Sequence, residues 1–129
     1  MIKKYLTKII AKSNKDLQII SACCENAKIK ASEIKYLKNN KIFLLLMKRI
    51  KNETNQNTQK IYSICKFEFV ENVGSKNINQ KDKGLMLELL AINLLKKNEK
   101  FEINIIFSNN AYITLSTEII EVTLEDQGE

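Results

Sequence analysis

Much of the chain alternates apolar and polar residues with a period of two, the pattern of β-strands that bury one face. The alternation is clearest from Phe101 to Phe107, where every second residue is apolar. Asn109 and Asn110 follow this segment, and asparagine tolerates the left-handed backbone that a tight turn requires. The pattern therefore predicts a β-hairpin whose return strand covers residues 111–116.

One segment has a helical period instead. Apolar residues recur from Leu17 to Cys24 at the spacing of a single helix face. Ser13 precedes them as a candidate N-cap, and Asp16, three residues later, complements the positive end of a helix. These features predict a helix over residues 15–25.

Shorter alternating segments predict further strands, and uninterrupted polar segments predict surface loops. The predicted loops cover residues 51–59 and 74–83. Near the end of the chain the alternation changes phase at Ile119–Ile120, which indicates a β-bulge or a last short turn of helix. The other predicted strands are residues 6–11, 27–31, 34–37, 41–50 and 60–73, with a tight turn at Asn39–Asn40.

The densest apolar segment of the chain is Gly84–Leu95, which a single charge, Glu88, interrupts. Its leucine, methionine and alanine residues favour a helix, but apolar residues on both alternating faces also suit a strand that is buried on both sides. Because a strand precedes the segment and a hairpin follows it, we predict a strand. The segment Phe43–Met47 is also apolar on both faces, which predicts a central strand or a face covered by a partner.

These elements predict an α+β fold. One N-terminal helix packs on a strongly curved, mostly antiparallel meander sheet of about seven strands, with a half-barrel as one form of that curvature. With 129 residues, of which 44% are apolar, the chain has the size of one domain and can bury a core without disulfides or metal ions. We therefore expect residues 1–129 to form a single domain.

The net charge of +6 raises nucleic acid as a partner, but the composition argues for another interpretation. Arg49 is the only arginine, and arginine is the side chain whose planar fork recognises phosphates and bases. Lysine, asparagine and isoleucine are abundant, whereas proline, tryptophan and histidine are absent, which is typical of genome-wide codon drift. We favour generic solvated lysines over a nucleic-acid surface.

The cysteines and the hydropathy of the chain bear on its compartment. The chain has three cysteines, Cys23, Cys24 and Cys65, and an odd number argues against a disulfide framework. The N-terminal residues start like a signal peptide, but lysines interrupt the apolar positions and no cleavage site follows. No apolar run approaches the roughly 20 residues of a membrane-spanning helix. We expect a cytoplasmic protein without membrane association.

The order of several short motifs resembles that of a family of small bacterial proteins known only as a domain of unknown function. The strongest match is Leu87–Ile92, and the chain closes with the matching segments Ile119–Glu121 and Leu124–Gly128. The resemblance implies no activity, and several departures from an arginine-rich pattern weaken any inference of a basic surface. The departures are Met47, Asn52, Phe69 and Gly74; the other matches are Asp16–Leu17, Ser21–Ala22, Tyr36–Leu37, Phe43, Arg49, Glu53, Phe67, Val70, Val73, Ser75–Lys76, Ile113 and Leu115.

Several chemistries are excluded or weakly supported. Without histidine the chain lacks Ser-His and Cys-His nucleophiles and most zinc and iron sites. Glu88 is a candidate general acid if it is desolvated; the alternatives are that it points outward or pairs with Arg49 or a lysine. Cys65 fits core packing better than a nucleophile. Glu121, Glu125 and Asp126 form an acidic cluster that is either a contact for a cation or a partner or, as we favour, a solvated end. We predict no catalytic residue, no cofactor and no metal ion.

The favoured function is a non-enzymatic binding or protein-interaction domain, because two strands are apolar on both faces and no catalytic set is recognisable. Such strands predict a homodimer or another protein partner. The alternative is an RNA-associated accessory protein that uses a lysine-rich surface together with Tyr36 and Tyr62. The candidate functional surface consists of Arg49, Lys76 and Glu88.

Overall fold

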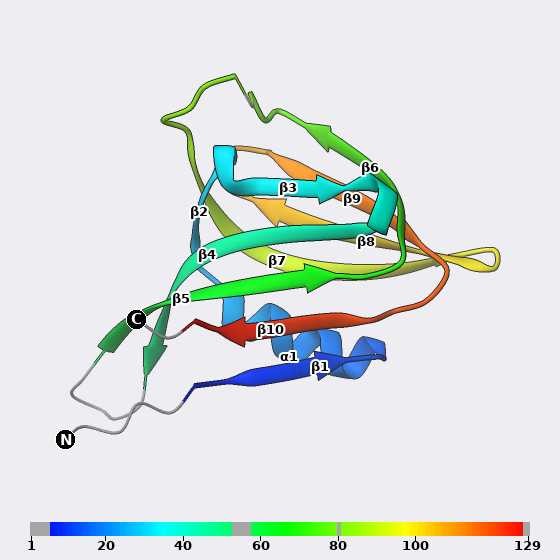
Figure 1. Cartoon of the computed structure of the whole chain (residues 1–129), viewed down its shortest axis with the longest axis horizontal. Helices are drawn as coiled ribbons and strands as arrows, with labels where there is room; N and C mark the ends of the chain where they lie inside the picture. The colour runs from blue at the N-terminus through cyan, green and yellow to red at the C-terminus, as the bar shows by residue number, and fades with distance from the viewer. Residues whose placement is uncertain (1–5, 53–57, 80, 128–129) are drawn as a thin grey trace.

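The computed structural model describes residues 6–52, 58–79 and 81–127, and these residues form one helix and one open sheet (Figure 1). The helix is α1 (Asn14–Cys24), and two short 3-10 turns are η1 (Ala31–Glu33) and η2 (Lys38–Asn40). The strands are β1 (Lys8–Ala11), β2 (Lys28–Lys30), β3 (Ile34–Leu37), β4 (Ile42–Asn52), β5 (Thr58–Phe67), β6 (Val70–Lys76), β7 (Met86–Lys97), β8 (Lys100–Phe107), β9 (Tyr112–Thr117) and β10 (Val122–Asp126).

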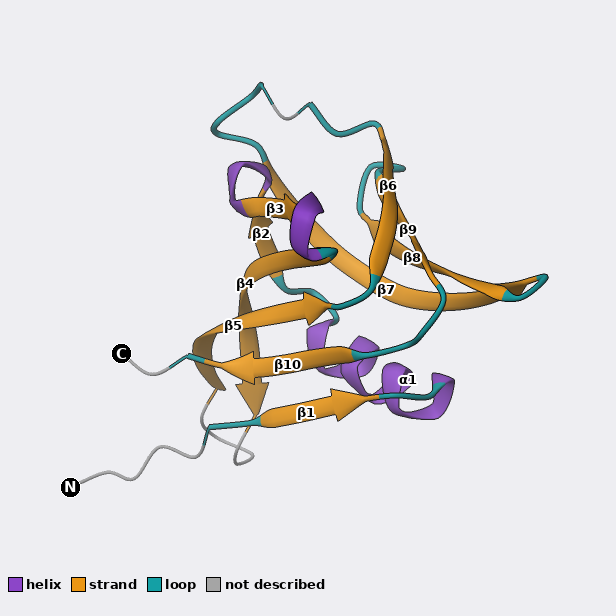
Figure 2. Ribbon diagram, turned by 45° about the vertical axis from the view of Figure 1, so that its right-hand side comes forward, coloured by secondary structure: helices purple, strands orange, loops and turns teal. Residues whose placement is uncertain are grey.

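The sheet has the strand order β1-β10-β5-β4-β2-β7-β8-β9-β6. The remaining strand, β3, pairs with β4 but is not part of this order. All of these neighbours are antiparallel. We call β1, β10, β5 and β4 the first half of the sheet and β7, β8, β9 and β6 the second half; β2 lies between them. The long strands β4 and β7 bend, so the sheet curves around its own core (Figure 2).

One hydrophobic cluster fills the concave side of the sheet. It includes Leu17, Ile20 and Cys24 of α1, which packs against β7 and β1. Phe43 and Phe67 meet in the same cluster, with ring centroids 6.0 Å apart. The inward residues of both halves therefore share one core, and the outward residues of each half form a separate exposed face.

The predicted helix is confirmed within one residue at each end. Ser13 is its N-cap, and the Ser13 Oγ accepts a hydrogen bond of 3.3 Å from the Asp16 backbone N–H. Leu17 and Cys24 are fully buried, as their shared helix face requires. Local sequence chemistry is thus sufficient to define this element.

The ambiguous segment Gly84–Leu95 is a strand from Met86 onward; this strand, β7, extends to Lys97 and pairs with β2 and β8. Its inward residues include Leu89 and Ile92, both fully buried. The register with β8 shifts just after Leu89, and beyond this irregularity the Ile92 N–H donates a 2.9 Å hydrogen bond to the Ser21 Oγ of α1. Pairing with β2 and β8 and burial of one face outweigh its helix propensity, whereas the predicted burial of both faces is wrong, because Leu90 and Leu95 on the other face are exposed.

The described residues contain ten strands rather than the seven or so that we predicted. The predicted strand over residues 60–73 is wrong as a single element, because the chain leaves β5 after Phe67 and starts β6 at Val70. Phe69 has a left-handed backbone (φ 60°) and is 42% exposed, so it does not continue the buried row of β5. The break lets the chain cross from the first half of the sheet to the second.

Three other predictions change in detail. Ile119–Ile120 is neither a bulge nor a helical turn; it lies in the bend between β9 and β10, which pair with different neighbours. Simple meanders are limited to two groups of described strands, β3-β4-β5 and β7-β8-β9. The predicted loop at 51–59 is shortened by β4 and β5 at its two ends, and residues 53–57 lie outside the described residues.

The turns also need a correction. β6 extends to Lys76 and so occupies the start of the predicted loop at 74–83. The predicted asparagine turn at 39–40 is a 3-10 turn whose left-handed residue is Lys41, with φ 57°. Asn109 and Asn110 do have left-handed backbones, as predicted for the turn after β8. Over the described part of the chain, no helix has the length and apolar character needed to cross a bilayer.

Candidate functional site

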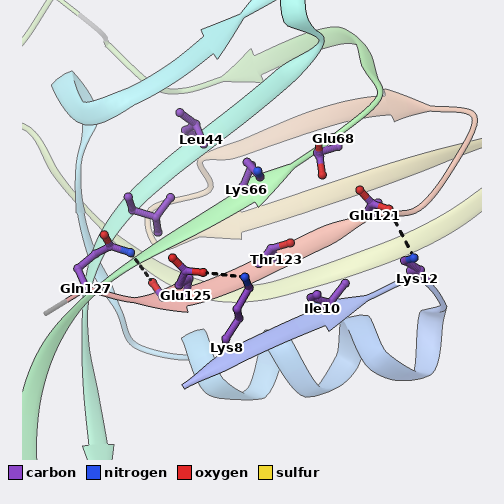
Figure 3. A pocket seen from close by; sticks show the side chains of 11 residues that line it. Lys8, Ile10, Lys12, Leu44, Lys66, Glu68, Glu121, Thr123, Glu125 and Gln127 are labelled. Atoms are coloured by element: carbon purple, nitrogen blue, oxygen red, sulfur yellow. Dashed lines mark hydrogen bonds and ion pairs between the residues drawn. The ribbon is translucent and has the colours of Figure 1, made fainter. Parts of the chain in front are cut away.

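The outer face of the first half carries a groove of about 440 Å³, which we call the charged groove (Figure 3). Its apolar lining consists of Ile10, Leu44 and Ile64, although outward residues of an exposed strand are usually polar. A second cavity, of about 380 Å³, also contacts Leu44 and Ile64 and extends the groove toward β3. The other lining residues of the charged groove are Lys8, Lys12, Lys66, Glu68, Glu121, Thr123, Glu125 and Gln127.

Strand alternation and register bring these side chains together. On β5, Ser63 and Cys65 are buried in the core, so Ile64 between them faces outward. Glu125 of β10 lies opposite Ile64, and Lys8 of β1 lies opposite Glu125. The groove therefore depends on pairing between the two ends of the chain and its middle.

The charges that line the groove cancel. Three lysines and three glutamates line it, in a chain whose net charge is +6. Lys8 Nζ lies 3.3 Å from Glu125 Oε2, and Lys12 Nζ lies 3.8 Å from Glu121 Oε1. Both lysine side chains are mostly exposed, so each pair contributes at most about 1 kcal/mol to stability. Their main consequence is a locally neutral surface made of charged groups.

Two carboxyl groups meet at one end of the charged groove. The hydrogen bond between the Glu68 and Glu121 side chains is the main cause that raises the pKa of Glu68; burial adds to the rise, and the charge of Lys66 opposes it. The Glu68 backbone N–H also donates to the Glu121 carbonyl oxygen at 3.0 Å. This end of the groove therefore favours a shared proton or a cationic group over two bare carboxylates.

The outer face of the second half carries a different groove of about 560 Å³, which we call the neutral groove. None of its lining residues is charged. The side-chain oxygen of its lining residue Asn104 on β8 accepts a 2.9 Å hydrogen bond from the Thr114 hydroxyl of β9. The lining residues are Leu90, Asn93, Leu95, Asn104, Ile106, Phe107, Asn109, Asn110, Ala111 and Tyr112.

Arg49 lies in the interior of the first half and not on an exposed surface as we predicted. Its side chain is 5% exposed, and its Nη2 donates to Asp126 Oδ1 at 2.8 Å. The Arg49 Nε donates to the Ser63 Oγ at 2.9 Å, and that hydroxyl in turn donates to Asp126 Oδ1 at 2.7 Å. Arg49 faces inward because it is two residues beyond the buried Met47 on β4.

Asp126 is buried as well, so the prediction of a solvated acidic end is wrong for this residue. Burial alone raises the pKa of a carboxyl group. Here hydrogen bonds from Ser63, from the Thr7 backbone and from Arg49, together with the charge of Arg49, outweigh burial and lower the pKa of Asp126 to about 2. Asp126 therefore stays ionised and joins β4, β5, β10 and the residue that precedes β1, Thr7, at one point.

The three predicted surface residues do not converge. Glu88 faces outward on β7 and forms an ion pair with Lys28 of β2, one of the alternatives considered for it. Lys76 ends β6 at the edge of the second half, opposite Tyr112. Among the described residues, no hydrogen bond or ion pair joins any two of Arg49, Lys76 and Glu88.

Tyr36 and Tyr62, the aromatic residues of the RNA alternative, lie on opposite faces of the sheet. Tyr36 packs on Phe43 in the core, and its hydroxyl donates to the Val70 carbonyl oxygen at 2.9 Å. Tyr62 is 55% exposed, and Lys48 Nζ lies 5.6 Å from its ring centroid. The two tyrosines therefore cannot form one stacking surface for bases.

Cys65 is fully buried in the core. A hydrogen bond with the Cys24 thiol, then burial, raises the pKa of Cys65 well above that of an ordinary thiol. A thiol that resists ionisation is a poor nucleophile, which agrees with the core-packing role expected for it.

Sequence reasoning considered Glu121 and Glu125 as possible contacts but missed the other charged residues of the groove, among them Lys66 and Glu68. Each looks like an ordinary solvated residue, and no local signal shows that β5 and β10 are neighbours. The available signal was the apolar segment Phe43–Met47, whose outward Leu44 contributes to the groove lining. A strand that is apolar on both faces predicts that its outward face is used, but it does not predict which charged residues lie beside that face.

Comparisons with known proteins give a family and no more. A family model described as a protein of unknown function, DUF2948, matches residues 7–129. No curated protein and no solved structure matches the chain.

Proposed function

The chain belongs to the DUF2948 family of proteins of unknown function, and we propose that it is a non-enzymatic protein-interaction domain that binds a partner protein across the charged groove. One observation carries the proposal: apolar side chains line a groove on the outer face of the sheet, and charged residues border it. Protein–protein interfaces have this anatomy, with an apolar centre and a polar rim. The two alternating apolar faces of Phe43–Met47 then have separate roles, one in the core and one in binding.

The partner's surface follows from the groove. Ile10, Leu44 and Ile64 require an apolar ridge, and lining charges of both signs that sum to zero require charges of both signs opposite them. The close carboxyl groups of Glu68 and Glu121 favour a lysine or arginine of the partner at that end. The expected partner is therefore a protein with an amphipathic ridge that carries a basic residue at one end.

A non-enzymatic role is supported by the chemistry of the groove. Its only ionisable groups are lysines and glutamates, and four of these six pair with each other. The chain has no histidine, and among the described residues no three cysteine, aspartate or glutamate side chains are grouped as metal ligands would be. We also propose that residues 1–129 act as a single domain, because one core cluster extends over both halves of the sheet. We propose further that this domain acts in the cytoplasm.

Site-specific photo-cross-linking in the native cells tests this function. With a benzophenone amino acid in place of Leu44, irradiation should give a discrete adduct with one partner protein. The same group in place of Ile19, a position on α1 that is more exposed than Leu44, should not give it. The substitution Ile64→Asp in the same chain should abolish the adduct. An adduct that survives Ile64→Asp, or that appears from both positions, contradicts binding across the charged groove.

A second candidate function is that of an RNA-associated accessory protein, and one contact favours it. Lys48 stands over the exposed ring of Tyr62, an arrangement that combines a cation with a surface on which a base can stack. A gel-shift assay with single-stranded RNA tests this role, since phosphate contacts weaken steeply with salt. Binding at low salt that is lost in Tyr62→Ala and Lys48→Ala supports the role, and no binding at low salt excludes it.

A further inference from the structure

The outward side chains of the second half form matched rows across three strands. Leu90, Ile106 and Tyr112 make an apolar row at one end of the neutral groove, with Ile106 and Tyr112 directly opposite each other. One step along the strands, Asn104 lies opposite Asn93 on one side and Thr114 on the other. The central strand of both rows is β8. The face is therefore apolar in one row and uncharged but hydrogen-bonding in the next.

We propose that the neutral groove is the contact surface between two copies of this chain, related by a two-fold axis that runs along β8. Such an axis exchanges β7 with β9 and leaves β8 facing its own copy. Ile106 then meets Ile106 of the second copy, while Leu90 meets Tyr112. Asn104 meets Asn104 in the same way. Each row is thus placed on itself, which is the condition for an isologous interface.

Charge favours a second copy as the occupant. Each chain carries +6, so two copies repel wherever their lysines face each other. No lysine lines the neutral groove, although 28% of the residues of the chain are charged. The nearest acidic group on β8, Glu102, is neutralised by Lys97, 3.3 Å away. Depletion of charge at the centre is also the compositional mark of protein interfaces.

The size of the face sets the strength of the dimer. Three strands about 4.8 Å apart, each contributing about six residues with a rise of about 3.4 Å, cover roughly 300 Å² in projection. A standard stable interface buries about 800 Å² of accessible surface on each partner. The dimer should therefore form in a concentration-dependent way and be visible only at high protein concentration.

Light scattering coupled to size-exclusion chromatography tests the dimer. The wild-type chain should shift from monomer toward dimer as its concentration rises to the high micromolar range. Ile106→Lys places two ammonium groups together at the axis and should leave a monomer at every concentration. The matched control is Ile10→Lys, an exposed isoleucine of the charged groove, which should dimerise as the wild type does. A monomeric wild type, or a dimer that survives Ile106→Lys, overturns the proposal.

A cysteine at the axis tests the geometry itself. In Ile106→Cys the two new thiols face each other across sheets packed about 10 Å apart, so a short bismaleimide that spans this gap should link the copies into a covalent dimer. The wild type, which retains Cys23, Cys24 and Cys65, and Ile10→Cys are the controls and should stay unlinked. A dimer in solution without an Ile106→Cys cross-link overturns the axis. This surface is separate from the charged groove, so the Leu44 adduct should persist in Ile106→Lys, and either proposal can fail alone.

Discussion

The two halves of the sheet differ both inside and outside. Behind the first half, the core contains an ion pair, Arg49–Asp126, with the hydroxyl of Ser63 between its members. Behind the second half, the inward residues are apolar apart from Thr117, whose buried hydroxyl has no hydrogen-bond partner among the described residues. The outer faces repeat the contrast, with a charged groove on the first half and a neutral groove on the second.

The difference follows from how each half is assembled. β7, β8 and β9 follow one another along the chain, and left-handed Asn98, Asn109 and Asn110 lie in their connecting turns, so local turn chemistry sets their register. β1 and β10 come from opposite ends of the chain, and no turn connects them. Asp126 bonds to the Thr7 backbone, to Ser63 and to Arg49, and we infer that this buried charge aligns the distant strands.

The largest expected change in stability comes from disrupting the Arg49–Asp126 ion pair of the first half. Arg49→Met should leave an ionised Asp126 buried without its cation and lower the free energy of unfolding by about 3–5 kcal/mol. Urea unfolding measures the change. The matched change in the second half, Ile105→Val, only removes a buried methylene and should cost about 1 kcal/mol. Equal losses for the two variants would show that the ion pair has no special role.

The double variant Arg49→Met/Asp126→Leu is the control for this result. It removes both charges together, so it should recover most of the stability lost in Arg49→Met. A double variant that is less stable than the single one would contradict the assignment of the loss to an unpaired charge.

A smaller change in stability than that of Arg49→Met is expected when the pH falls, and it also depends on Asp126. Asp126 has a pKa of about 2 in the folded protein against 3.8 for an ordinary aspartate, and a lowered pKa stabilises the fold where the group is ionised. This contribution, about 2 kcal/mol, is present above about pH 4 and should disappear as the pH falls toward 2. Acid titration of the unfolding free energy measures it. The Arg49→Met/Asp126→Leu variant should lose this part of the acid dependence, and an unchanged profile would refute the assignment.

A stabilising change is expected in the second half. Thr117→Val keeps the shape of the side chain and removes a buried hydroxyl that lacks a partner, so it should raise the free energy of unfolding by about 1 kcal/mol. Thermal unfolding measures the shift. The comparison variant is Ser63→Ala, which removes a hydroxyl bonded to Arg49 and Asp126 and should destabilise. A destabilised Thr117→Val would mean that its hydroxyl is satisfied.

The smallest expected effect concerns the carboxyl pair of the charged groove. Because the pKa of Glu68 is raised, its ionisation opposes folding, and stability should fall slightly as the pH rises through that pKa. Glu68→Gln removes this loss and should leave stability at neutral pH slightly higher. Glu125→Gln, which removes the partner of Lys8, should have the opposite sign. Stability curves of both variants across the acid range distinguish the two effects.

The candidate site was predictable only in part. The two-faced apolar segments Phe43–Met47 and Gly84–Leu95 do supply residues to the two grooves, and this could be seen from their alternation. Arg49 was predicted as part of a functional surface because it is one of the basic candidates, yet alternation on β4 places it on the same buried face as Met47. Asp126 became its partner through a contact between residues 77 positions apart, which no local pattern reports.

The sequence alone determined the elements whose cause is local. The Ser13 cap and the apolar face that starts at Leu17 specify α1, and alternation with asparagine turns specifies the hairpin of β8 and β9, because each depends on residues a few positions apart. The tertiary structure decided the rest. It determines which strands are neighbours, that strand pairing is interrupted at Phe69, and that Arg49 and Asp126 are buried while the two grooves lie on the outer faces of the sheet. These outcomes depend on the order of strands across the sheet, and that order is set by long-range packing of a shared core.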